Sequence, residues 1–136
     1  MKVLVTGGAG FIGSNLVEGL LNDERISGVR VLDNLSTGFK HNIEEFFDNP
    51  RFEFLEGDIR DYDICMKACE GINLISHQAA LGSVPRSISN PRATNAVNIS
   101  GFLNIFTCFD GHVTAARARE IASGCMAWYF RRGEHV

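Results

Sequence analysis

Short apolar runs alternate with amphipathic stretches along most of this chain. Val3-Leu4-Val5 and Val29-Arg30-Val31-Leu32 are typical of buried strands, and Asn15 to Leu21 has helical spacing. We expect strands over residues 2–6, 29–33, 52–55 and 72–77, helices over 11–22, 40–48, 62–69 and 93–108, and a loop around Gly82, Pro85 and Pro91. This alternation predicts an α/β fold, a doubly wound parallel sheet with right-handed crossovers.

A glycine-rich segment, Thr6-Gly7-Gly8-Ala9-Gly10-Phe11-Ile12-Gly13, joins the first strand to the first helix. Gly7 allows a tight turn, Gly10 allows close approach of a pyrophosphate, and Gly13 allows the helix to pack against the strand. The helix start would offer free N–H groups to the phosphates. The spacing is Gly-x-x-Gly-x-x-Gly rather than Gly-x-Gly-x-x-Gly, and its position predicts a dinucleotide-phosphate site.

An acidic residue, Asp33, ends the second strand about twenty residues further on. A carboxylate there can accept hydrogen bonds from the adenosine ribose hydroxyls, and it would repel a 2′-phosphate. Asn34 and Leu35 follow, with no arginine to receive that phosphate. The pattern therefore favours NAD over NADP. The alternative is an ordinary turn acid.

The loops that follow the strands should meet at the carboxyl edge of the sheet. There Asp58 could accept from an adenine amino group while Ile59 packs on the ring; the alternative for Asp58 is a turn residue near the Asp61 cap. Ala79 and Ala80 are small enough to let the backbone approach a cofactor, although core packing would explain them too.

Composition narrows the classes of partner. The chain has 136 residues, 45% of them hydrophobic, so we expect at most one domain with a real core. A net charge of −3 gives no reason to expect nucleic acid or an anionic membrane. No apolar run approaches the ~20 residues of a membrane span, and Met1-Lys2 leads directly into the first strand. We therefore expect no signal peptide and a cytoplasmic location.

Two cysteines, Cys65 and Cys69, are spaced to share one face of a helix. They could ligate a metal or pair under oxidation. We favour small buried side chains and expect no metal, because no second ligand pair has suitable spacing.

These motifs resemble the extended short-chain dehydrogenase/reductase family, in particular the NAD-dependent epimerases and dehydratases of nucleotide sugars. The resemblance covers about residues 1–106 and rests on segments 6–13, 33–38, 57–61 and 77–87, followed by Asn95, Asn98, Gly101 and Asn104. The loop Gly82-Ser83-Val84-Pro85-Arg86-Ser87 is similar to that of the 4-epimerases that act on UDP-N-acetylhexosamines.

The resemblance implies a reversible oxidation at C4 of a UDP-sugar, with NAD as hydride acceptor and donor. The residues that it implies for the NAD site are Gly7, Gly10, Phe11, Ile12, Asp33, Asn34, Ser36, Thr37, Gly38, Asp58, Ile59, Gln78, Ala79, Ala80 and Asn98. Gly82 and Ser83 would face the sugar. We expect a structural role for His77, and for Arg86 we leave open a surface charge or contact with a substrate phosphate.

The family's catalytic pair is missing. Relatives of this kind use a tyrosine with a lysine four residues later, which lowers the pKa of the phenol. Here Met66 follows Tyr62 at that spacing, Gly133 follows Tyr129, and no lysine lies beyond Lys67. We therefore assign no catalytic residue and expect no turnover by this chain.

The family pattern is lost near residue 107. We interpret residues 1–107 as an incomplete Rossmann-type NAD-binding half-domain and residues 108–136 as a frameshifted or otherwise aberrant tail. Two alternatives are a genuine but divergent short protein, and a tail that is a surface segment for a partner, with 125–130 as a real apolar strand. An incomplete sheet would leave an edge unpaired, which invites association and leaves a homo-oligomer open.

Two other functions fit the same residues. One is a nucleotide-binding module without chemistry. The other is a fragment of a dehydratase or decarboxylase that acts on another nucleotide sugar, because these enzymes share much of the pattern.

Overall fold

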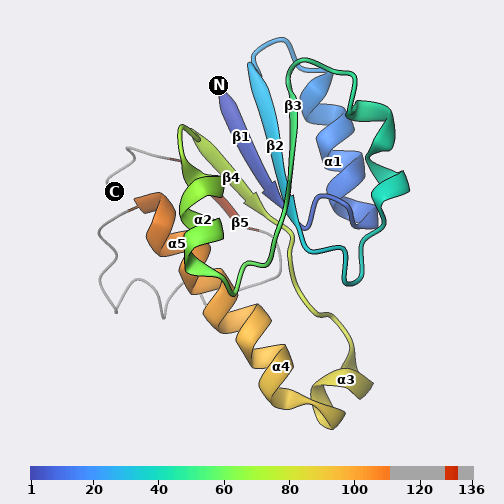
Figure 1. Cartoon of the computed structure of the whole chain (residues 1–136), viewed down its shortest axis with the longest axis vertical. Helices are drawn as coiled ribbons and strands as arrows, with labels where there is room; N and C mark the ends of the chain where they lie inside the picture. The colour runs from blue at the N-terminus through green and yellow to red at the C-terminus, as the bar shows by residue number, and fades with distance from the viewer. Residues whose placement is uncertain (111–127, 132–136) are drawn as a thin grey trace.

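The computed structural model describes residues 1–110 and 128–131. Its sheet has the strand order β3-β2-β1-β4-β5 (Figure 1). The strands are β1 (Lys2–Thr6), β2 (Gly28–Asp33), β3 (Phe52–Glu56), β4 (Leu74–His77) and β5 (Trp128–Arg131). The first four run parallel, as the alternating pattern predicted. The α/β, Rossmann-type fold is therefore confirmed.

Helices cover both faces of the sheet, which is why β1 and β2 are buried almost throughout. The helix α1 (Phe11–Leu21) packs on one face, where Val5 and Val31 contact its buried Val17 side. The opposite face carries α2 (Tyr62–Cys69) and α5 (Phe102–Asp110), which pack over Leu4 and Ile75. Successive residues of β1 therefore pack alternately into two separate hydrophobic cores.

The predicted helix over 40–48 is wrong. The structure has two short 3-10 turns, Lys40–Asn42 and Glu44–Phe46. Ile43 separates them with non-helical angles, φ −128° and ψ −1°, and its side chain is completely buried. Burial of Ile43 in the core under α1 therefore takes precedence over a continuous helix.

The loop expected around residues 82–91 contains two short helices, α3 (Val84–Ser89) and α4 (Pro91–Asn95). Ser83 and Asn90 cap them, each accepting from a backbone N–H three residues later, and a proline follows each cap. The predicted helix over 93–108 exists, but it is composite: a π-helical stretch, Ala96–Gly101, joins α4 to α5.

The edge of β4 that faces away from β1 is paired with another strand. β5 pairs with β4 in antiparallel register, so the sheet is not wholly parallel. This strand overlaps the apolar run that one interpretation of the tail placed at 125–130. The predictions for residues 111–127 and 132–136 concern residues outside the described ranges.

None of the helices in the described ranges has the length and apolar character needed to cross a bilayer.

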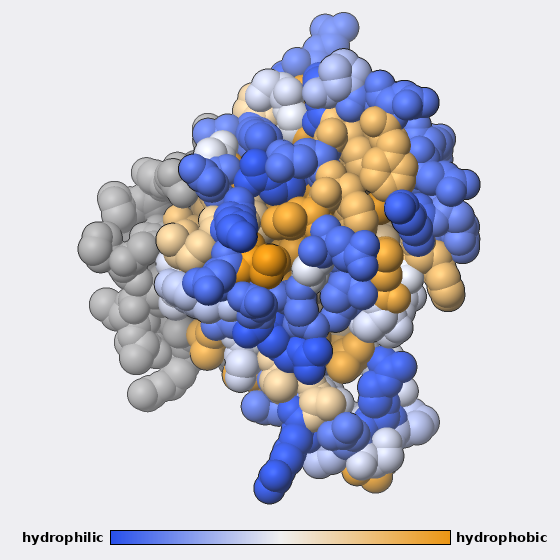
Figure 2. Space-filling view, viewed as in Figure 1, coloured by the Kyte–Doolittle hydropathy of each residue, from blue (hydrophilic) through white to orange (hydrophobic). Residues whose placement is uncertain are grey.

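Apolar residues reach the molecular surface at several places, as Figure 2 shows in the orientation of Figure 1. The apolar residues of β3 are only partly buried, and Phe47, which is exposed, packs edge-on against Phe52 and Phe54. Lys40 lies over the Phe47 ring, 5.5 Å from its centroid. The aromatic rings thus cover the face of the outer strand next to α1.

Two glycines of α1 give a matched stability test. A Cβ at Gly13 would lie 2.2 Å from the Gly7 carbonyl oxygen, whereas a Cβ at Gly19 would meet nothing within 4 Å. We expect Gly13→Ala to lower the free energy of unfolding by about 3 kcal/mol, because rigid backbone must move. Gly19→Ala should raise it by about 1 kcal/mol, as alanine favours the helix. Urea unfolding followed by circular dichroism measures both, and wild-type stability in Gly13→Ala would contradict this packing.

Candidate functional site

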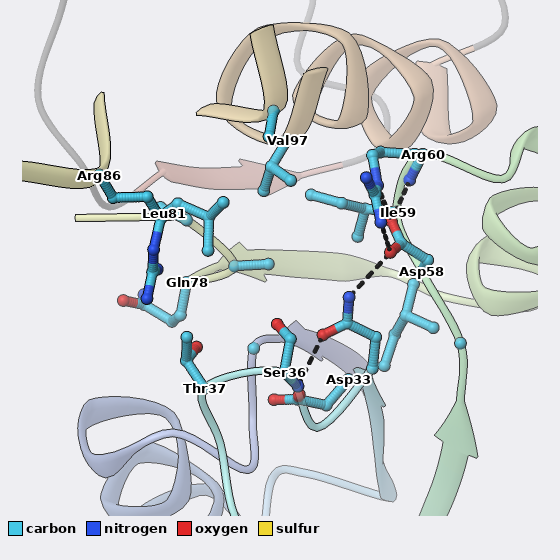
Figure 3. A pocket seen from close by; sticks show the side chains of 17 residues that line it. Asp33, Ser36, Thr37, Asp58, Ile59, Arg60, Gln78, Leu81, Arg86 and Val97 are labelled. Carbon is cyan, nitrogen blue, oxygen red and sulfur yellow. Dashed lines mark hydrogen bonds and ion pairs between the residues drawn. The ribbon is translucent and has the colours of Figure 1, made fainter. Parts of the chain in front are cut away.

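A cavity of about 280 Å³ opens at the carboxyl ends of the parallel strands. Its lining comes from the glycine turn after β1, from the end of β2, from the loops after β2, β3 and β4, and from α3, α4 and the π-helical stretch. Figure 3 shows Asp33, Asp58, Gln78, Arg86 and Val97 around it. Its lining is Gly7, Leu32, Asp33, Asn34, Ser36, Thr37, Gly57, Asp58, Ile59, Arg60, Gln78, Ala79, Ala80, Leu81, Arg86, Ala93 and Val97. The predicted convergence of these loops is confirmed.

The glycine turn is shaped by close backbone contacts. Gly7 has a positive φ of 70°, and a Cβ there would come within 2.7 Å of the Ala79 backbone nitrogen. Gly13 lies against the turn itself rather than the strand, as its contact with Gly7 shows. Gly10 is the N-cap of α1, and no side chain among the described residues caps this helix. Its first N–H groups therefore remain available to an anion.

Asp33 fastens the glycine turn to the end of β2. One carboxylate oxygen accepts from the backbone N–H of Ala9 at 2.9 Å, and the other accepts from that of Leu35 at 2.8 Å. Asp33 is 8% exposed, yet it still lines the cavity. A carboxylate oxygen has room for a second hydrogen bond, so Asp33 can hold the turn and accept from a ligand hydroxyl.

The loop after Asp33 holds the other side of the same turn. The Ala9 carbonyl accepts from the Phe39 backbone N–H at 3.0 Å and from the Asn42 amide at 2.8 Å. Gly38 lies so close that a Cβ would come within 2.7 Å of Ala9. The turn is therefore fixed before any ligand arrives.

The far end of the cavity carries a charge pair and a crosslink between two loops. Arg60 donates to both Asp58 oxygens, at 2.9 Å and 2.6 Å, and holds the pKa of that carboxyl well below its usual range. The Asn34 amide donates to the same carboxylate at 2.8 Å, bridging the loops after β2 and β3. Asp58 thus has a fixed orientation toward the cavity.

The helices behind the cavity hold the Asp58–Arg60 segment in place. The Asn104 amide donates to the carbonyls of Ile59 and Arg60, at 3.0 Å and 3.1 Å. Gly101, in the π-helical stretch, allows Ile59 to pack where a Cβ would be 2.6 Å away. Ile59 therefore packs against Gly101, and it also lines the cavity.

Asn98 fixes the backbone of Leu81 in the loop after β4. Its amide donates to the Leu81 carbonyl at 3.2 Å and accepts from the Leu81 N–H at 2.8 Å. Asn98 does not line the cavity among the described residues, so it acts through Leu81, which does.

His77 lies beneath the cavity rather than in its lining. Its Nδ1 is 2.8 Å from the Thr6 hydroxyl, and its ring packs edge-on against Phe102. Burial lowers the pKa of His77 to about 4. This environment supports the structural interpretation of the residue.

The cysteine pair lies in the core between α2 and α5. Cys65 and Cys69 are almost completely buried, and the Cys65 thiol donates to the Ile59 carbonyl. Burial raises the pKa of the Cys65 thiol to about 12, so it remains a thiol at neutral pH.

Ten of the predicted NAD-site residues line the cavity: Gly7, Asp33, Asn34, Ser36, Thr37, Asp58, Ile59, Gln78, Ala79 and Ala80. Seven other predicted site residues lie outside its lining: Gly10, Phe11, Ile12, Gly38, Gly82, Ser83 and Asn98. Phe11 and Ile12 form the exposed first turn of α1, and Ser83 caps α3. Sequence reasoning missed Arg60 in the lining, although it stands inside the quoted segment 57–61, and Arg86 was left undecided.

The model of the NAD dependent epimerase/dehydratase family matches residues 3–129. A UDP-glucose 4-epimerase from Mycolicibacterium smegmatis is 42% identical over 106 residues, which are 77% of this chain and 33% of that protein. The chain spans about a third of the length of the curated relatives it matches.

Solved structures of nucleotide-sugar enzymes are also similar to this chain. A dTDP-glucose 4,6-dehydratase from Streptomyces venezuelae, crystallised with NAD, has a TM-score of 0.72 and 37% identity. The match covers 79% of this chain and 35% of the dehydratase. A UDP-N-acetylglucosamine 4-epimerase from Methanobrevibacter ruminantium, in complex with UDP-N-acetylmuramic acid, has a TM-score of 0.70 and 36% identity, covering 79% of this chain and 33% of that one.

The burial of His77 predicts a pH-dependent stability. The unfolded chain protonates this imidazole near pH 6.5, whereas the folded chain resists protonation down to about pH 4. The free energy of unfolding should therefore fall as the pH drops through that window, by up to about 1.4 kcal/mol per pH unit. Denaturant unfolding at several pH values measures the slope.

Two variants isolate the effect. His77→Asn should flatten the slope between these pH values, and His41→Asn, at an exposed histidine, should leave it. An unchanged slope in His77→Asn would rule out His77 as its source.

Proposed function

This chain belongs to the NAD-dependent epimerase/dehydratase family, and we propose that it is the NAD-binding part of a nucleotide-sugar 4-epimerase. The observation that carries the proposal is the joint position of the glycine turn and Asp33 at one cavity, held together by the hydrogen bond to Ala9. A dinucleotide needs both groups at once, one for its diphosphate and one for its adenosine ribose.

The residues present fit NAD. The uncapped start of α1 offers N–H groups to the diphosphate, and the positive φ of Gly7 allows the tight turn between β1 and α1. Phe11 and Ile12, exposed in the first helical turn, carry N–H groups suited to this role. Gly10 leaves room there for a phosphate oxygen, because its Cβ position meets only the Gly7 carbonyl, at 3.3 Å.

The adenosine half belongs at the Asp58 end of the cavity. Asp33 would accept from the ribose hydroxyls, with Asn34, Ser36, Thr37 and Gly38 shaping the same loop. Asp58 would accept from the adenine amino group, and Ile59 would pack on the ring. Gln78, Ala79 and Ala80 would line the nicotinamide side, supported by Asn98 through Leu81.

NAD, when bound, supplies hydride transfer at C4 of the sugar. The chain's own residues bind and orient it, and Gly82 and Ser83 are the proposed neighbours of the sugar. Neither tyrosine has a lysine four residues later, so we expect no turnover by this chain alone. A module that binds the nucleotide without chemistry remains the alternative, and turnover of a UDP-sugar by this chain would contradict both.

The sugar, the location and the assembly are parts of the proposal. We propose a UDP-sugar of the glucose or N-acetylglucosamine type, a cytoplasmic location, no nucleic-acid or membrane partner, and a homo-oligomer as an open possibility. Residues 1–107 are the proposed binding half, and 108–136 are a proposed aberrant or divergent tail. A dehydratase of nucleotide sugars is the second candidate function, because the Streptomyces dehydratase matches the same part of the fold with its NAD bound.

Binding measurements test the proposal. Isothermal titration should show NAD binding in the micromolar range and NADP binding at least about tenfold more weakly, because Asp33 would repel a 2′-phosphate. No detectable binding of either dinucleotide would contradict the proposal.

A charge-matched pair of variants tests the role of Asp33. Asp33→Asn should weaken NAD binding about tenfold and reduce the preference over NADP, since one acceptor and the charge are lost. Asp48→Asn removes the same charge at an exposed position and should change neither quantity. Thermal unfolding of both variants shows whether they are folded, and an unchanged NAD-to-NADP ratio in Asp33→Asn would contradict the assignment.

A further inference from the structure

Arg86 lines the cavity and has no charged partner among residues 1–110. Its side chain extends from α3 toward Gln78, at the end of the cavity away from Asp58 and Arg60 (Figure 3). Within residues 1–110 no carboxylate lies within ion-pair distance of its guanidinium. We infer that Arg86 is an anion receptor that binds a diphosphate oxygen of the bound nucleotide. This inference rests on the proposed nucleotide-binding function.

Most arginines in the described ranges have partners, which sets Arg86 apart. Arg25 pairs with Asp23, Arg30 with Glu53 and Arg60 with Asp58. Arg51 donates to the Asp23 and Ile26 carbonyls beyond the end of α1. Arg92 has no such partner either, but it does not line the cavity. Only for Arg86 do an unpaired guanidinium and a cavity wall coincide in this part of the chain.

The backbone that carries Arg86 is well fixed. Ser83 accepts from the Arg86 N–H at 3.3 Å, and Asn90 donates to the Arg86 carbonyl at 2.8 Å, at the two ends of α3. Asn98 holds Leu81 just before the helix. The side chain of Arg86 therefore extends from a helix whose ends are fixed by hydrogen bonds.

The charge balance of the cavity favours an anion beside Arg86. The Asp58 charge is compensated by Arg60, and both Asp33 oxygens already accept backbone N–H groups. A diphosphate brings two negative charges, and the glycine turn offers them only N–H dipoles. Arg86 supplies the full positive charge, and its planar group suits two phosphate oxygens.

The diphosphate has two sources in the proposed reaction, the dinucleotide and the sugar nucleotide. The test compares wild type with Arg86→Ala, Arg86→Lys and the control Arg92→Ala by nuclear magnetic resonance titration. The ligands are ADP and adenosine for the dinucleotide, and UDP and uridine for the sugar nucleotide. Arg92 is the matched control because it is an exposed helical arginine six residues further on.

We expect Arg86→Ala to weaken binding of at least one diphosphate about tenfold, while the matching nucleoside is unaffected. Arg86→Lys should recover part of the loss, and Arg92→Ala should behave as wild type. A loss confined to ADP assigns Arg86 to the cofactor, and one confined to UDP assigns it to the substrate.

Three results would overturn the inference or its premise. If Arg86→Ala and Arg92→Ala behave equally with both diphosphates, the inference about Arg86 is refuted and the proposed function is not. A nucleoside weakened as much as its diphosphate would show a structural effect instead. Wild type that binds none of the four ligands would refute the proposed function, and the inference with it.

Discussion

The hydrogen bond from the Ala9 N–H to the Asp33 carboxylate is the contact on which the candidate site depends. It joins the turn after β1 to the end of β2, which are neighbours in the sheet but 24 residues apart in sequence. With the Ala9 carbonyl held by Phe39 and Asn42, both peptide groups of this residue are fixed. A phosphate site made of backbone N–H groups is useful only if the backbone is already in place, and this contact provides that order.

The cavity that results is electrically uneven. Its Asp58–Arg60 end is neutral overall and crosslinked by Asn34, which suits a base and a ribose. Its other end is positive because of Arg86, which is carried by a short helix. The segment before this helix is fixed by the hydrogen bonds between Leu81 and Asn98. A ligand with an uncharged nucleoside at one end and a charged linkage further along matches this distribution.

Much of the site could be predicted from sequence because its chemistry is local. Gly7 and Asp33 lie at strand ends, and strand ends in a parallel sheet are forced to one edge. The supports of the site could not be predicted in this way. Asn42 and Asn104 act across 33 and 45 residues, on carbonyls of Ala9 and Ile59, and no local pattern marks such a partner. The failed helix over 40–48 has the same origin, since Ile43 is pulled into a core assembled from distant strands.

The most direct measurement is a crystal structure of this chain grown with NAD. The account predicts the adenosine ribose within hydrogen-bond distance of Asp33, the adenine beside Ile59, and the diphosphate at the start of α1. NAD bound elsewhere on the chain, or bound in the cavity with its ribose away from Asp33, would contradict it.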